Sequence, residues 1–66
     1  MTLLLGVDTG GTYTDAVLIR DEAHVIASAK SLTTREDLAL GIGAVVRDVL
    51  VRAAVSPKDI SLASLS

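Results

Sequence analysis

Short apolar runs, separated by polar or glycine-containing turns, make up the first half of the chain. Their lengths and flanking residues predict β-strands at about residues 2–8, 12–20 and 24–30. Gly10-Gly11 marks the first reversal, and Asp21-Glu22-Ala23 marks the second. We therefore expect a β-hairpin followed by a third strand.

Helical spacing replaces this pattern in the second half. Apolar residues recur with a period that predicts a helix from Arg35 to about Ala54. Thr33 and Glu36 have the spacing of a capping box at its start. The apolar positions expected to face the sheet are Leu38, Ile42, Val45, Val49 and Ala53.

A short helical turn is expected next, with Ser56 as its N-cap and Pro57 as its first residue. Residues 60–66 could begin another strand.

Apolar residues occupy both faces of the first two strands, for example Leu5 on one face and Leu4 on the other. Because one helix covers only one face, the other should meet another helix layer, a second chain or polypeptide beyond Ser66. The sequence predicts an α/β unit, incomplete by itself, in which residues 1–66 are the N-terminal part of something larger.

The loop after the first strand gathers residues suited to phosphate and metal. Gly10-Gly11 would allow positive φ and close approach of a ligand, and the N–H groups of residues 10–12 could form an anion-binding nest. Asp8 offers an oxygen ligand suited to Mg²⁺. The hydroxyl groups of Thr9, Thr12 and Thr14 add donors around the same point. With no lysine or arginine in the loop, the metal would have to offset most of the phosphate charge.

The spacing of the acidic residues also supports a metal site. A two-residue turn at Gly10-Gly11 would pair Asp8 with Tyr13 across the hairpin. Asp8 and Asp15 would then be diagonal neighbours on one face of the sheet, roughly 7–8 Å apart. That separation would let the two carboxylates flank a hydrated metal ion.

Glycines at this spacing also occur in other kinds of loop. A glycine pair between two apolar runs is also an ordinary hairpin turn. The P-loop requires a lysine followed by serine or threonine, which this loop lacks. Gly41-Ile42-Gly43 is followed by Val46 where a dinucleotide fingerprint needs its third glycine. Neither of these two nucleotide-binding motifs is therefore expected.

Composition narrows the remaining classes. The 66 residues allow one small unit, and a net charge of −2 with six dispersed basic residues argues against nucleic-acid binding. No run approaches the ~18 apolar residues needed to span a bilayer, and the first residues lack the basic region typical of a secretory signal, so no export is expected. The absence of cysteine is compatible with the cytoplasmic location that we expect.

The run Gly6-Val7-Asp8-Thr9-Gly10-Gly11-Thr12-Tyr13-Thr14-Asp15-Ala16-Val17 resembles the N-terminal region of the hydantoinase A and 5-oxoprolinase family, which includes acetone carboxylase subunits. Ala29-Lys30-Ser31, Thr33-Thr34 and the stretch 37–42 continue the resemblance. Related sugar kinases usually place lysine after Gly-Gly-Thr, which makes this run fairly specific. Tyr13 stands where phenylalanine is common in the family.

This resemblance implies an actin-like, ribonuclease H-like ATPase fold that binds ATP and Mg²⁺. The loop would be the first phosphate-binding element, with Asp8 near the magnesium and Asp15 a second catalytic group near the metal or substrate. The family positions carried over to phosphate binding are Thr9, Gly10, Gly11, Thr12 and Thr14. In full-length members, ATP hydrolysis is coupled to opening a cyclic amide or to activating a carbonyl compound for carboxylation.

The resemblance also limits what this chain would do alone. The second phosphate loop, the adenosine pocket and the substrate site would lie beyond Ser66, in the remainder of the chain or in a second subunit. Residues 1–66 should therefore have no catalytic activity by themselves. Two alternatives remain: a sugar kinase of the same ATPase fold, and a non-catalytic module that self-associates through its uncovered sheet face.

Overall fold

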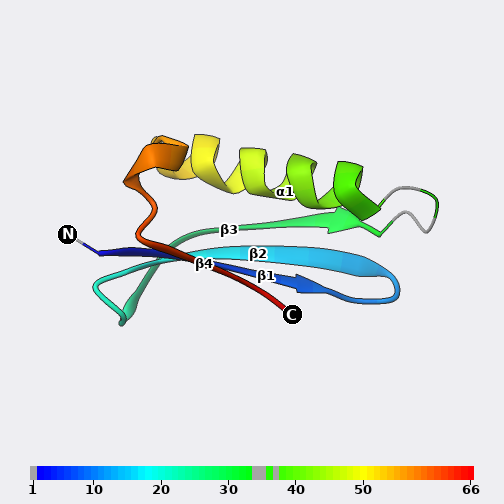
Figure 1. Ribbon diagram of the computed structural model, residues 1–66, viewed down its shortest axis with the longest axis horizontal. Coiled ribbons are helices and arrows are strands. Elements are labelled where there is room, and N and C mark those ends of the chain that lie inside the picture. The colour runs from blue at the N-terminus through cyan, green and yellow to red at the C-terminus, as the bar shows by residue number, and fades with distance from the viewer. Residues whose placement is uncertain (1, 34–35, 37) are drawn as a thin grey trace.

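The computed structural model describes residues 2–33, 36 and 38–66 as a four-stranded sheet with one α-helix against it (Figure 1). The order along the chain is β1, β2, β3, α1, a 3₁₀ turn and β4. Their bounds are β1 Leu3–Thr9, β2 Tyr13–Arg20, β3 His24–Leu32, α1 Leu38–Ala53, the 3₁₀ turn Pro57–Asp59 and β4 Leu62–Leu65. The three predicted strands, the helix and the final strand are confirmed within a few residues.

The sheet is mixed and has the spatial order β3-β2-β1-β4. β1 pairs antiparallel with β2, and β2 pairs antiparallel with β3. β4 adds to the free edge of β1 in the parallel direction. A parallel neighbour requires a crossover connection, and α1 with the 3₁₀ turn supplies it.

Helix α1 covers one face of the sheet, mainly over β2 and β3 (Figure 1). Leu18 and Val49 are fully buried where strand and helix meet. Of the predicted helix positions, Val45 and Val49 are confirmed in the core, whereas Leu38 is exposed and Leu50 is buried in addition. The buried apolar set is Leu3, Leu5, Val7, Ala16, Leu18, Ala29, Val45, Val49 and Leu50.

The opposite face of the sheet has no cover within the described part of the chain. Leu4, Val17 and Ile19 are half-buried on it, and Val25 and Leu62 are largely exposed. One helix therefore protects one face only, as the apolar pattern predicted. What covers the other face stays a prediction.

The two reversals differ in their backbone. Asp21 and Glu22 both have positive φ, of 53° and 67°, and Ala23 N–H donates to Arg20 C=O. This is the left-handed geometry of a type I′ hairpin turn. The Asp21 carboxylate also accepts from Thr2 N–H, so the predicted second reversal is confirmed and is tied to the beginning of β1.

The predicted helix start at Arg35 lies outside the described residues. The described helix begins at Leu38 and Glu36 lies in a turn outside it, so the predicted Thr33–Glu36 capping box is wrong. Thr33 is bonded instead to the β1–β2 loop. At the other end, Ala54 has φ 58°, and Val55 N–H donates to Leu50 C=O, which closes the helix as a Schellman motif does.

The 3₁₀ turn begins as predicted. Ser56 precedes Pro57, Ser56 N–H donates to the Asp59 carboxylate, and Asp59 N–H donates to Ser56 C=O. No helix among the described residues has the length and apolar character needed to cross a membrane.

Candidate functional site

The β1–β2 loop lies at the end of the sheet where β3 ends and α1 begins (Figure 1). Gly10 N–H donates to Tyr13 C=O at 2.8 Å, and Thr9 pairs with Thr14. The two residues of the turn are therefore Gly11 and Thr12. The turn predicted at Gly10-Gly11 is wrong by one residue.

The glycines act differently from the expectation. Neither has positive φ, so the predicted left-handed conformation is wrong. A Cβ atom at Gly10 would lie only 2.8 Å from the Tyr13 carbonyl oxygen, whereas a Cβ at Gly11 would meet no atom within 4 Å. Gly10 is required because the two strands approach closely there. Gly11 leaves open space at the tip of the loop.

The open space is accompanied by unused donors. The N–H groups of Gly11 and Thr12 have no partner among the described residues, while Gly10 N–H is already bonded. Thr12 is exposed, and its hydroxyl has no hydrogen-bond partner in the described part of the chain. Adjacent backbone N–H groups at such a turn can receive an anion.

The other two threonine hydroxyls of the loop are used within the fold. Thr9 Oγ1 donates to the Ser66 carbonyl oxygen at 3.0 Å. Thr14 is 2% exposed, and its Oγ1 lies 3.1 Å from Thr33 Oγ1. The roles of Thr9 and Thr14 as ligand donors stay predictions, and both hydroxyls would have to leave these partners.

Asp8 and Asp15 are direct partners across β1 and β2. The register differs by two residues from the predicted one, so they face each other instead of lying diagonally. An even shift keeps the side of every residue, and the predicted placement on one face is confirmed. Directly opposed residues of this kind have Cα atoms roughly 4.5–5.5 Å apart, and like charges there repel each other.

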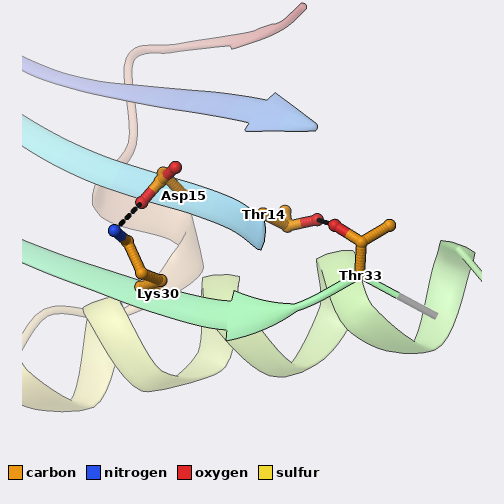
Figure 2. Close-up of polar contacts among 4 residues, drawn as sticks. All are labelled: Thr14, Asp15, Lys30 and Thr33. Atoms are coloured by element: carbon orange, nitrogen blue, oxygen red, sulfur yellow. Dashed lines mark hydrogen bonds and ion pairs between the residues drawn. The ribbon is translucent and has the colours of Figure 1, made fainter. Parts of the chain in front are cut away.

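A hollow of about 240 Å³ lies beside this pair on the uncovered face, and Gly6 and Val17 form part of its wall. Asp8 has no ion-pair partner among the described residues. Asp15 has one, since its Oδ1 lies 3.7 Å from Lys30 Nζ on β3 (Figure 2). The charge of Asp8 is therefore the one left to be balanced by something else.

Lys30 lies on β3, the strand next to β2. The pairing of β3 with β2 places it opposite Asp15 and its Nζ 5.0 Å from the centre of the Tyr13 ring. Both side chains of the ion pair are more than half exposed, so the pair contributes at most about 1 kcal/mol. Its importance is positional, because it brings a cation to the loop, which has none of its own.

The arrangement can be tested for its fit to magnesium. No cluster of three or more His, Cys, Asp or Glu side chains occurs among the described residues, so they form no all-protein metal cage. Magnesium usually keeps several waters and binds through one or two carboxylates plus substrate phosphates. An exposed Asp8 beside Asp15 and unpaired loop amides fits that type of site.

The fold also occurs in solved structures of other proteins. Component A of (R)-2-hydroxyglutaryl-CoA dehydratase from Acidaminococcus fermentans superposes with a TM-score of 0.88 at 18% identity, over 98% of this chain and 24% of that one. The activator of 2-hydroxyisocaproyl-CoA dehydratase from Clostridium difficile, determined with bound ADPNP, gives 0.86 at 17% identity, over 97% and 23%. A diol dehydratase-reactivating factor in nucleotide-free form gives 0.84 at 28% identity, over 100% and 12%.

These structures are actin-like ATPase-fold proteins, and the chain spans about a quarter or less of each of them. The β-β-β-α arrangement with its added parallel strand is therefore part of an actin-like ATPase domain, as the sequence predicted. A comparison with curated protein sequences gives no match.

The sequence profile of one protein family covers almost all of the chain. It describes the hydantoinase/oxoprolinase N-terminal region and matches residues 4–66. These residues include α1 and the whole sheet apart from Leu3, the first residue of β1. The chain thus belongs to the hydantoinase/oxoprolinase N-terminal region family.

Proposed function

We propose that the β1–β2 loop binds the phosphates of ATP, with Mg²⁺ beside Asp8, in an ATP-dependent enzyme of the hydantoinase/oxoprolinase type. The observation that carries this proposal is the pair of opposed carboxylates, Asp8 and Asp15, next to a turn with two unpaired amides. Family membership supports it, as does the ADPNP bound in one structure of the same fold.

Each residue of the loop has a distinct task in this function. The N–H groups of Gly11 and Thr12 and the Thr12 hydroxyl would bind phosphate oxygens. Asp8 would hold the hydrated magnesium through a carboxylate oxygen, because its own charge is unpaired. When bound, Mg²⁺ neutralises charge on the phosphates, and ATP supplies the phosphoryl group.

Asp15 would stand second to Asp8. Its carboxylate is shared with Lys30, which reduces the repulsion between the two acids in the absence of the metal. Asp15 would therefore orient water around the metal or contact the substrate, as the family resemblance implies. The remaining nucleotide contacts and the site for a cyclic amide would come from polypeptide outside residues 1–66.

The test is ATP hydrolysis by the purified full-length protein, with and without Mg²⁺, in the presence of 5-oxoproline, a hydantoin or a sugar. We expect Mg²⁺-dependent hydrolysis that a cyclic amide stimulates and that opens its ring. Phosphorylation of the sugar would identify a sugar kinase of the same fold instead. Absence of nucleotide binding, together with concentration-dependent self-association, would favour a non-catalytic module.

A further inference from the structure

Thr33 directly follows β3 and makes three hydrogen bonds around the β1–β2 loop. Its Oγ1 donates to the Gly10 carbonyl oxygen at 2.8 Å, and its N–H donates to the Thr12 carbonyl oxygen at 2.8 Å. The third joins its Oγ1 to Thr14 Oγ1 at 3.1 Å, and Figure 2 shows these two oxygens facing each other. The bonds to Gly10 and Thr12 lie on either side of Gly11.

The direction of the hydroxyl protons follows from simple counting. Thr33 has one O–H, and Gly10 C=O accepts it. The contact with Thr14 must therefore be donated by the Thr14 hydroxyl. Thr14 is 2% exposed, so Thr33 both satisfies a buried donor and fixes the orientation of the Gly10 carbonyl.

That carbonyl determines where a loop amide points. Gly10 C=O and Gly11 N–H belong to the same peptide unit, which is trans and planar. In a trans peptide the C=O and N–H point in opposite directions. When Thr33 holds the Gly10 oxygen, the Gly11 N–H is directed away from Thr33 and stays free of partners among the described residues.

We propose that Thr33 is a positioning residue for the nucleotide: its hydroxyl holds the Gly10 carbonyl so that Gly11 N–H is presented to a phosphate oxygen. This inference rests on the proposed function of the loop. Thr33 itself does not touch the phosphate. Its loss would allow the Gly10–Gly11 peptide to rotate, and the donor would then have to be ordered again at each binding event.

The experiment measures the dissociation constant of a non-hydrolysable ATP analogue with Mg²⁺ for the full-length protein. Thr33→Val removes the hydroxyl and keeps the shape, and Thr33→Ser keeps the hydroxyl. We expect Thr33→Val to weaken binding about tenfold, the effect of losing one well-placed hydrogen bond, and Thr33→Ser to stay within about twofold. Thr33→Ala gives a second hydroxyl-free variant with the same expectation.

A core variant separates positioning from stability. Val49 is a fully buried residue of α1 and is far from the loop in sequence, so Val49→Ala should lower the unfolding temperature but leave the dissociation constant of the folded protein unchanged. The inference would be overturned if the dissociation constant of Thr33→Val stayed within twofold of the wild type. It would also be overturned if Thr33→Ser lost as much affinity as Thr33→Val. Either result would leave the proposed function standing. Wild-type protein that binds no nucleotide would overturn both.

Discussion

Asp8→Asn in the full-length protein is expected to lower Mg²⁺-dependent ATP hydrolysis by about 100-fold, the loss that corresponds to roughly 3 kcal/mol of metal-mediated stabilisation. Asparagine keeps the size of the side chain and removes the charge that would hold the magnesium. Asp8 directly faces Asp15, so removing one negative charge also relieves repulsion. The unfolding temperature should therefore stay the same or rise slightly, and lost activity will not reflect lost structure.

The matched control is Asp48→Asn. Asp48 is another aspartate of the chain, paired with Arg52 on α1 at 3.0 Å, and the change should leave hydrolysis unaltered. The measurement is the steady-state rate at saturating ATP over a range of Mg²⁺ concentrations. Hydrolysis by Asp8→Asn at the wild-type rate would remove Asp8 from the metal site.

The two loop glycines should respond in opposite ways to alanine. Gly10→Ala would place a Cβ 2.8 Å from the Tyr13 carbonyl oxygen, which is backbone and cannot move aside without opening the hairpin. We expect a loss of about 1–3 kcal/mol in the free energy of unfolding, typical of a group forced into occupied space. Urea unfolding of the full-length protein and the variant measures it.

Gly11→Ala is its control. No atom lies within 4 Å of a Cβ at Gly11 and its φ is not positive, so we expect stability within about 0.5 kcal/mol of the wild type. The new methyl group would nevertheless stand beside the amide that we assign to phosphate, so nucleotide binding should weaken. Equal stability losses for the two variants would contradict the assigned turn.

The sheet and its faces could be predicted from the sequence because they depend on local pattern. The strands and the existence of two reversals follow from apolar runs and turn residues, and these were confirmed, although the first turn lies one residue later than predicted. The placement of Asp8 and Asp15 on one face survived an incorrect register, because the true register differs by an even number of residues. That conclusion depends only on whether the register error is an even or an odd number of residues.

The finer geometry could not be predicted, because it depends on contacts between distant segments. The turn lies at Gly11 and Thr12, one residue later than predicted, because Gly10 is needed where the two strands come closest. That close approach is to the Tyr13 carbonyl oxygen, and residue type alone does not reveal it. Lys30 lies at the site because β3 pairs with β2 and places it opposite Asp15. The β2–β3 register shifts between Leu18 and Ile19, so counting from the turn alone would not give this pair. The spacing of Thr33 and Glu36 suggested a capping box, whereas the Thr33 hydroxyl donates to the Gly10 carbonyl oxygen.

The central claim is that the β1–β2 loop receives the phosphates of ATP. A structure of the full-length protein with a non-hydrolysable ATP analogue and Mg²⁺ tests it most directly. We predict a phosphate oxygen within hydrogen-bonding distance of Gly11 N–H or Thr12 N–H, and the magnesium on the Asp8 side of the loop. Phosphates bound elsewhere, with no contact to residues 10–12, would contradict the claim.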